Sequence, residues 1–295
     1  MTPPMTIATL WRYPVKSMLG EQVDETELGT AGIAGDRTYA LIDQSDGLVA
    51  SAKHPAKWGA LLGFRARFAE PPVPGEEAAM VTVTFPDGSE VQSDDPAIHE
   101  RLSRALGRDV VLASHAPEHP VFEEVWPDVP GMAPQEFIDQ VATGRDAAGE
   151  TVSEIALAMG APAGTFFDLA PLHLLTTATL DRLSRLSPGA THDPRRYRPN
   201  IVVTAAVDAF VEDDWVGRTV GLGADARATV MLSTMRCVMV TLPQADLPRD
   251  RRTLRGIAEH NRVDIPGLGT WACAGVYAGV AAPGTVRVGD PVVVR

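Results

Sequence analysis

The sequence predicts an α+β protein that is mainly β, with two β-barrel-like domains and a few peripheral helices. Three observations lead to this fold class. The chain has 295 residues, which at about 150 residues per domain suggests two domains. Short apolar runs separated by Gly, Pro, Asn and Asp recur along it, as is typical of short strands. Helical periodicity is confined to a few segments, which favours closed barrels over a doubly wound sheet.

The N-terminal part, expected to form a domain over residues 1–114, shows the strand pattern most clearly. Turn signals such as Pro86-Asp87-Gly88 separate its apolar runs. Residues 95–106 carry apolar side chains at a spacing of four and precede Gly107, which predicts a helix that ends there. The expected strands lie at residues 6–11, 38–43, 48–51, 61–68, 80–85, 90–92 and 110–113.

Residues 115–164 are expected to be a linker or a surface excursion. Repeated prolines interrupt a stretch rich in Asp and Glu, a composition that suits a connecting segment. The boundary between the two domains is therefore placed here.

Residues 165–295 are expected to form the second domain. A strand at 172–175 runs into a helix capped near Thr176 or Thr177, because a hydroxyl side chain there can accept from the first free backbone N–H groups. The other expected elements are strands at 200–204, 229–232 and 237–241, a helix at 251–262, and a hairpin that joins 285–288 to 292–294.

Composition excludes several classes of protein. The net charge of −12 argues against a nucleic-acid binder, which needs a positive footprint. Two cysteines exclude a disulfide framework and a four-cysteine zinc site. The longest uncharged stretch, residues 265–286, contains seven Gly and Pro residues, so no membrane span is expected. No targeting segment is visible, and a cytoplasmic protein is expected.

Two motifs in the N-terminal part are candidates for anion binding. Lys16 and Ser17 follow a proline-stiffened turn and together offer an ammonium group and a hydroxyl. Arg37 ends a glycine-bracketed turn and offers a bidentate fork for phosphate. The alternative is that Lys16 is a solvated turn residue and that Arg37 pairs with Asp36 or another surface acid.

A third cluster, Arg195-Arg196-Tyr197-Arg198-Pro199-Asn200, concentrates three arginines in an acidic chain. It predicts an anion pocket in which Arg198 and Asn200 take part. The alternative is a surface cluster paired with Asp193 or with residues 212–214. The three arginines cannot all point inward.

The two cysteines are candidate catalytic residues, and Cys237 is also the candidate metal ligand. Arg236 precedes Cys237, and an adjacent cation favours the thiolate that attacks or binds metal. The alternative is a buried thiol that acts as a small hydrophobe. Cys273 lies in an apolar, glycine-bearing strand, which favours an inert core thiol. The scattered histidines predict no zinc site.

Several blocks resemble the MOSC family (molybdenum cofactor sulfurase C-terminal domains). Residues 13–17 and 32–37 resemble the opening of that family's N-terminal β-barrel domain. Residues 198–203 and 210–217 resemble the central stretch of the MOSC domain. Residues 236–241 and 283–292 resemble its later blocks. The matches run in order from about residue 7 to 294, nearly the whole chain.

The resemblance implies a molybdopterin-type molybdenum cofactor between two β-rich domains. The sequence is similar in its motifs to the amidoxime-reducing members of the family. These proteins reduce N-hydroxylated small molecules and receive electrons from separate electron-transfer proteins. Cofactor contacts implied by the matching positions are Lys16, Ser17, Arg37, Thr176, Arg198 and Asn200. Where those reductases carry the metal-ligating cysteine, this sequence has Asn261, Arg262 and Val263. The ligand is therefore expected from Cys237 or Cys273, or is missing.

Three functions are consistent with the sequence. The first is a molybdopterin-dependent oxidoreductase that acts on a small-molecule substrate. The second is a sulfur-carrier or cofactor-handling protein with a persulfide on one of the cysteines. The third is a non-enzymatic binder of another anionic small molecule, and pyridoxal phosphate remains open as such a ligand.

Overall fold

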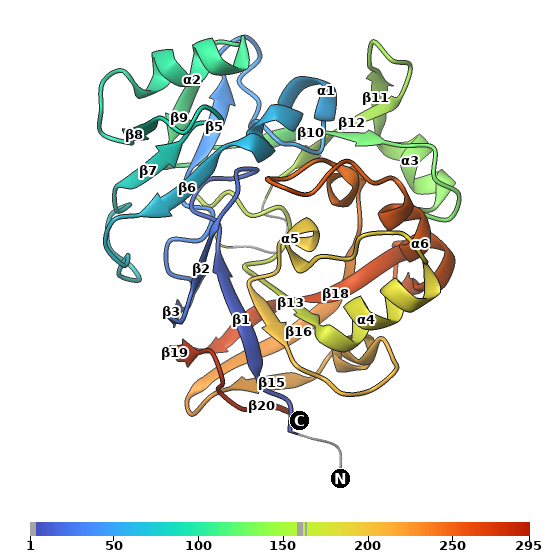
Figure 1. The fold of residues 1–295 in the computed structure, drawn as a ribbon. Helices are drawn as coiled ribbons and strands as arrows, with labels where there is room; N and C mark the ends of the chain where they lie inside the picture. The colour runs from blue at the N-terminus through green and yellow to red at the C-terminus, as the bar shows by residue number, and fades with distance from the viewer. Residues whose placement is uncertain (1–3, 158–161, 163) are drawn as a thin grey trace.

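The protein is mainly β with a few helices, as Figure 1 shows. This computed structural model describes residues 4–157, 162 and 164–295. The strands form one nine-stranded sheet, three sheets of three strands and one pair. The strand pairing of the described residues contains no closed ring, so closure into two barrels stays a prediction.

The nine-stranded sheet joins the two ends of the chain. Strand β1 (Ile7–Arg12) pairs with β14 (Ile201–Val203), with Leu10 opposite Ile201. The predicted N-terminal domain therefore contributes to a sheet that is otherwise built by the C-terminal half. Its order is β2 (Glu21–Val23), β1, β14, β13 (Leu172–Thr176), β18 (Gly269–Ala282), β16 (Ala226–Met235), β15 (Thr219–Leu222) and β20 (Val292–Val294), and β17 (Arg262–Ile265) pairs with β18.

Most of the rest of the N-terminal part packs around a core that includes Trp58, Phe64 and Leu102, whereas Leu28 and Ile33 pack into the core of the nine-stranded sheet. Helix α2 (Ile98–Leu106) confirms the predicted helix and ends at Gly107, whose φ of 66° suits glycine. The other elements are β3 (Glu25–Gly29), β4 (Gly32–Ile33), β5 (Ala40–Asp43), α1 (Pro55–Trp58), the 3-10 turn η1 (Gly59–Gly63), β6 (Arg65–Phe68), β7 (Val81–Thr84), β8 (Glu90–Gln92) and β9 (Val110–Ala113).

The segment 115–164 contains secondary structure of its own. Strands β10 (Val121–Trp126), β12 (Thr151–Ala156) and β11 (Ala142–Arg145) form a three-stranded sheet, and helix α3 (Gln135–Val141) precedes β11. Residues 158–161 and 163 of this segment lie outside the described residues. The prolines fall between these elements, where a missing N–H interrupts no strand pairing.

Helix α4 (Thr177–Leu186) follows β13 directly, as predicted. The hydroxyl of Thr176 caps it by accepting from the backbone N–H of Thr179, and it donates to the buried Glu212 carboxylate 2.5 Å away. The remaining helical elements are α5 (Pro194–Tyr197), η2 (Val211–Trp215), η3 (Val238–Thr241) and α6 (Arg252–His260).

Four sequence predictions about local structure are wrong. Residues 48–51 form no strand, and Val49 makes only an isolated bridge to Ile42. Residues 238–241 form the 3-10 turn η3 instead of a strand, and residues 59–63 form η1, so the strand predicted at 61–68 starts only at Arg65. The C-terminal hairpin does not form, because β19 (Gly284–Arg287) pairs with β3 and β20 pairs with β15. An apolar run and a Gly-Asp-Pro turn show where strands end, but not which neighbour each strand takes.

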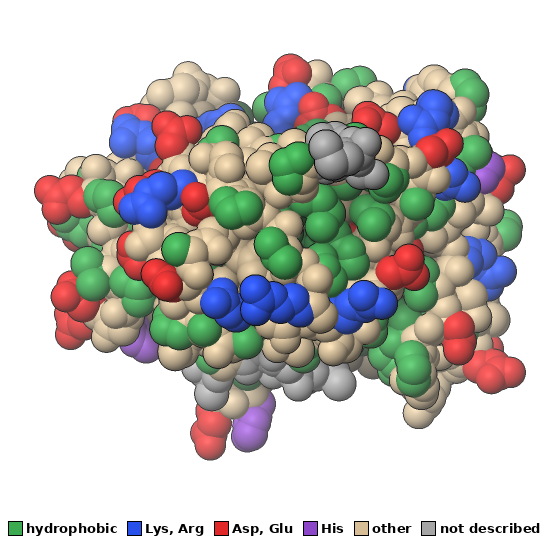
Figure 2. Space-filling model, turned by 90° about the horizontal axis from the view of Figure 1, so that it is seen from below, with side chains coloured by type: hydrophobic (Ala, Val, Ile, Leu, Met, Phe, Trp, Pro, Cys, Tyr) green, Lys and Arg blue, Asp and Glu red, His purple; other side chains and the backbone are tan. Residues whose placement is uncertain are grey.

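The charged side chains are distributed over the face of the molecule that Figure 2 shows. On the face in Figure 2, acidic and basic side chains are interspersed with hydrophobic ones, so the negative net charge is not gathered into one patch there. Among the described residues, no helix is long and apolar enough to cross a membrane.

The Thr176 cap yields a stability prediction. Thr176→Val keeps the shape of the side chain but removes the cap of α4 and leaves Glu212 without its hydroxyl donor. We expect the free energy of unfolding to fall by about 1–3 kcal/mol, measured by urea denaturation. Thr229→Val, at an exposed position of β16, is the control and should change stability by less than about 0.5 kcal/mol. Equal effects in the two variants would contradict the role given to Thr176.

Candidate functional site

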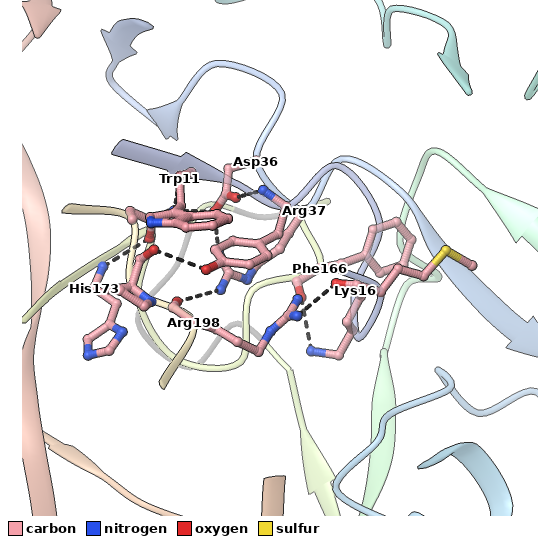
Figure 3. Close-up of polar contacts among 11 residues, drawn as sticks. Trp11, Lys16, Asp36, Arg37, Phe166, His173 and Arg198 are labelled. Carbon is pink, nitrogen blue, oxygen red and sulfur yellow. Dashed lines mark hydrogen bonds and ion pairs between the residues drawn. The ribbon is translucent and has the colours of Figure 1, made fainter. Parts of the chain in front are cut away.

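A cavity of about 230 Å³ is lined by residues from all three parts of the chain. Lys16, Ser17 and Arg37 come from the N-terminal part, and Arg198 comes from the loop between α5 and β14. Four of the six residues predicted to hold a cofactor thus line one cavity. Figure 3 shows how closely Lys16, Arg37 and Arg198 lie to one another.

Lys16 is a buried lysine, so the alternative of a solvated turn residue is wrong. Its backbone N–H donates to Tyr39 O at 2.8 Å, which fixes the start of the side chain. Its Nζ donates to Phe166 O at 3.1 Å and pairs with the Asp168 carboxylate (Figure 3 shows the first contact). Burial lowers the pKa of Lys16 to about 8, against the opposing effect of Asp168.

The sequence predicts two alternatives for Arg37, a place in an anion site and an ion pair with Asp36. Arg37 lines the cavity and also pairs with Asp36. The Asp36 carboxylate is itself fixed, since its Oδ1 accepts from Tyr13 N at 2.7 Å and its Oδ2 accepts from Asn200 Nδ2 at 2.9 Å. The Arg37 guanidinium lies 4.9 Å from the centre of the Tyr13 ring. Its orientation is therefore set by a buried carboxylate on one side and an aromatic face on the other.

Arg198 is a second buried arginine at the same cavity. Its Nη1 donates to Met18 O at 2.7 Å, and its guanidinium lies 4.2 Å from the centre of the Tyr13 ring. Its Nη2 is buried and has no hydrogen-bond partner within the described structure. Burial and the nearby Arg37 lower the pKa of Arg198 to about 10, which means that its charge is only partly compensated.

Three cavity residues share an uncommon backbone conformation. Ser17, Arg37 and Arg198 have φ values of 63°, 49° and 54°. Side chains other than Gly, Asn and Asp rarely adopt this left-handed region, and each such residue costs about 1–3 kcal/mol. Such strain concentrates at functional sites, so this shared conformation supports a binding role for the three residues.

The three arginines predicted as one cluster separate into three environments. Arg195 pairs with Asp193 and Asp246 near the surface. Arg196 is buried and donates to the carbonyls of Val240, Leu242 and Pro248. Arg196 and Arg198 both line the cavity, and each has one buried nitrogen without a hydrogen-bond partner in the described structure, Nε of Arg196 and Nη2 of Arg198. The position of Arg198 thus fits the predicted anion pocket, and the position of Arg195 fits the alternative of a surface ion pair.

The remaining two predicted contacts hold the surrounding structure instead of lining the cavity. Thr176 caps α4, as described above. Asn200 is buried beside the site, where its Oδ1 accepts from His173 N at 3.1 Å while its Nδ2 donates to Asp36. Asn200 therefore acts on the cavity through Asp36 and Arg37.

Sequence reasoning missed an acid–base cluster on the cavity wall. Lys53 Nζ lies 3.2 Å from Glu124 Oε2 and 3.4 Å from Asp168 Oδ2, so Asp168 bridges Lys53 and Lys16. Burial would lower the pKa of Lys53, but Asp168 and Glu124 raise it well above its usual value. Conversely, burial would raise the pKa of Asp168, and Lys16 and Lys53 lower it below the usual range. The scarcity of lysine was the signal, since two of only three lysines meet here.

His173 and Arg236 form a second pair that the sequence did not indicate. Arg236 donates to Nε2 of His173 and to Ala274 O. Because arginine keeps its proton, Nε2 must accept, and burial together with Arg236 lowers the pKa of His173 well below its usual value. His173 is thus a neutral, positioned ring on the cavity wall.

The two cysteines differ in their access to the cavity. Cys237 lines it, together with Lys16, Arg37 and Arg198. Cys273 is fully buried in β18, and Asn261 Nδ2 donates to its carbonyl at 3.0 Å. Burial raises the pKa of Cys237 to about 11 and that of Cys273 to about 12. Arg236 does not activate Cys237 as one reading proposed, because its side chain is bound to His173 and Ala274.

No group of three or more His, Cys, Asp or Glu side chains that would suit a metal ion occurs in the described part of the chain. Cys237, the metal ligand predicted from the sequence, lines the cavity and offers a sulfur atom to it.

Two family models that follow one another along the chain identify it as a MOSC protein. Residues 4–106 match the family described as the MOSC N-terminal beta barrel domain, and residues 162–293 match the MOSC domain. The chain belongs to this family.

Its relatives include two mitochondrial proteins. The chain is 25% identical over 296 residues to mitochondrial amidoxime reducing component 2 of Rattus norvegicus, and the match covers 97% of this chain and 82% of that protein. It is 24% identical over 310 residues to mitochondrial amidoxime-reducing component 1 of Homo sapiens, with the same shares covered. A crystal structure of the YUAD protein from Bacillus subtilis aligns over 100% of this chain and 97% of that chain, with 10% identity and a TM-score of 0.45.

The lowered pKa of Lys16 yields a pH prediction. An anion at the cavity interacts best with protonated Lys16, so affinity should fall as the pH rises through about 8. With sulfate, whose own charge is constant here, we expect about tenfold weaker binding at pH 9 than at pH 7. Isothermal titration calorimetry across this range measures the effect. Lys16→Arg, which keeps its charge, should bind with a flat profile, and an equally steep fall in this variant would contradict the assignment.

Proposed function

We propose that this protein binds a molybdopterin-type molybdenum cofactor in the cavity and reduces N-hydroxylated or similar small molecules there. The family and the names of its amidoxime-reducing relatives support a function related to this cofactor. The observation that carries the proposal is the unpartnered Nη2 of Arg198, buried beside Lys16 and Arg37.

The chemistry of the cavity fits the phosphate group of such a cofactor. Arg37 is paired with Asp36 and Lys16 with Asp168, whereas no ion pair to Arg198 exists among the described residues. An unpaired buried cation is costly, and a bound anion removes that cost. Arg198 and Arg37 would bind the phosphate through guanidinium donors, and Lys16 and Ser17 would add an ammonium group and a hydroxyl.

Cys237 is the residue we propose as metal ligand. Soft thiolate ligands suit transition metals of this kind, and its thiol lies on the cavity wall. Its raised pKa means that the free thiol keeps its proton near neutral pH. A metal ion deprotonates a coordinating thiol outright, so the raised pKa does not oppose this role.

The bound cofactor would supply the redox chemistry, and the chain would bind and orient it. In the overall reaction, two electrons and two protons convert an N-hydroxylated group to the reduced nitrogen compound and water. The electrons would come from a separate electron-transfer protein, because the sequence contains no flavin or haem motif. The neutral His173 and the Lys53–Glu124 pair would line the space in which the substrate sits.

Two further proposals concern the domain boundaries and the cellular location. The domains would be residues 1–114 and 165–295, each approaching a barrel, with 115–164 as an excursion that reaches the cavity through Phe122, Glu124 and Trp126. A cytoplasmic location likewise remains an expectation from the sequence.

A sulfur-carrier function is the second candidate, because Cys237 reaches the cavity. Uptake of sulfane sulfur requires the thiolate as nucleophile, and the raised pKa of Cys237 leaves little of it. A thiol that keeps its proton therefore suits persulfide formation less well than cofactor binding.

Cofactor retention tests the phosphate site. Protein produced in a host that makes the molybdenum cofactor should contain molybdenum and pterin, measured by elemental analysis and by pterin fluorescence after oxidation. Arg198→Met should lower both about tenfold or more, since it removes a charge-assisted contact. Arg195→Met removes a neighbouring arginine paired at the surface and should retain both. Wild-type protein without molybdenum or pterin would overturn the proposal.

Paired cysteine variants test the metal ligand. Cys237→Ala should lose most of its molybdenum while a measurable fraction of the pterin remains, because the phosphate contacts persist. Cys273→Ala should keep its molybdenum, since that thiol is buried away from the lining. Thermal melting checks that each variant is folded. Loss of metal in the Cys273 variant alone would mean that Cys273, and not Cys237, is the metal ligand.

A further inference from the structure

Part of the cavity wall is aromatic and has no role in holding an anion. Trp126 of β10, Phe137 of α3 and Trp271 of β18 meet there, and all three line the cavity. The ring centres of Phe137 and Trp271 are 4.9 Å apart, with the planes inclined at 73°. Trp126 lies 6.0 Å from Phe137 and 6.1 Å from Trp271. We call these three side chains the aromatic wall.

The polar atoms of the aromatic wall are already used inside the protein. Nε1 of Trp126 donates to Ser153 Oγ at 2.8 Å, and Nε1 of Trp271 donates to Leu268 O at 2.7 Å. The two indole rings therefore present carbon surface to the cavity. Leu268, Met235 and Val240 also line it and extend this apolar surface.

Part of this apolar surface is incompletely buried. Leu268 is 38% exposed although it is a large aliphatic side chain, and Phe137 is only partly buried. Exposed apolar groups beside a cavity are a common mark of a ligand site. A dry cavity of about 150 Å³ is enough to bind benzene, so a cavity of about 230 Å³ has room for one ring with a substituent.

We propose that the aromatic wall binds a planar, uncharged aromatic ring of a small molecule. A ring gains edge-to-face and stacked contacts with the three aromatic side chains, which a saturated ring cannot make. A charged group would lose its hydration against these three rings without finding a partner on them, because both indole N–H groups are already used inside the protein. As a statement about the substrate, the inference rests on the proposed function, whereas ring binding itself does not.

Segment 115–164 would thereby set the specificity of the cavity. It supplies Trp126 and Phe137, while the residues of the anion site come from the other two parts of the chain. Changes in α3 would then alter which ring is accepted without changing how an anion is held.

Three uncharged amides provide the test. Benzamide carries a planar ring, cyclohexanecarboxamide a saturated ring of similar size, and acetamide none. Each is titrated into the purified full-length protein, with calorimetry for affinity and tryptophan fluorescence for location. We expect benzamide to bind about tenfold or more tightly than acetamide, and several-fold more tightly than the cyclohexyl compound. Equal binding of the two ring compounds would overturn the aromatic part of the proposal, and equal binding of all three would overturn it entirely.

Variants locate the ring. Phe137→Leu keeps an apolar side chain and should weaken benzamide binding about three- to tenfold, with cyclohexanecarboxamide unchanged. Leu268→Asp, at an exposed position, should weaken both. Phe210→Ala is the control, because Phe210 packs beneath Arg182 and does not line the cavity in the described structure. Loss of benzamide binding in the control alone would overturn the location.

These titrations also separate this inference from the proposed function. Protein without molybdenum or pterin that still binds benzamide at Phe137 would contradict the proposed function and support the aromatic wall. Protein that retains the cofactor but does not discriminate among the three amides would do the reverse.

Discussion

The arrangement of the cavity depends on one buried carboxylate, that of Asp36. It accepts hydrogen bonds from the backbone of Tyr13, from the side chain of Asn200 and from Arg37. It therefore links the segment after β1 to the loop before β14. The guanidinium groups of Arg37 and Arg198 lie 4.9 Å and 4.2 Å from the centre of the Tyr13 ring, and the negative charge of Asp36 stabilises both of them. The pairing of β1 with β14 brings these segments together, and Asp36 makes their close approach electrostatically tolerable.

The cavity combines groups that are costly to assemble. Cations are buried, and three residues hold left-handed backbone conformations. Folding must supply the free energy for this arrangement from the apolar cores around it. The result is a set of donors fixed before any ligand arrives, which spares the ligand the entropy of ordering them. The proposed anion site and the aromatic wall would thus bind two different groups, an anion at the cationic side chains and a ring at the aromatic ones.

The sequence predicted the elements that depend on local rules. Helix α2, the cap of α4 by Thr176 and the strand around Ile201 follow from side-chain periodicity and hydrogen-bonding capacity within a few residues. The predictions from the sequence failed where a partner distant in the sequence decides which structure a segment adopts. Residues 238–241 turn into a 3-10 helix after β16, and the last two strands join different sheets although only a short turn separates them. Asn200 looked like a ligand contact because an amide bonds equally well to a cofactor or to a buried carboxylate.

The sequence by itself determined the family, the mainly β character and the residues from which the proposed anion site is built. These properties reside in residue types and their order, which a chain carries before it folds. Only the tertiary structure decided that Arg196 and Arg198 line the cavity while Arg195 pairs at the surface, and that Cys237 lines the cavity while Cys273 does not. Successive side chains on the short helix α5 point in different directions, and the left-handed backbone at Arg198 redirects its side chain. Spacing along the sequence cannot encode such directions, because they arise from packing between segments that are distant in the sequence, such as Arg198 against Met18.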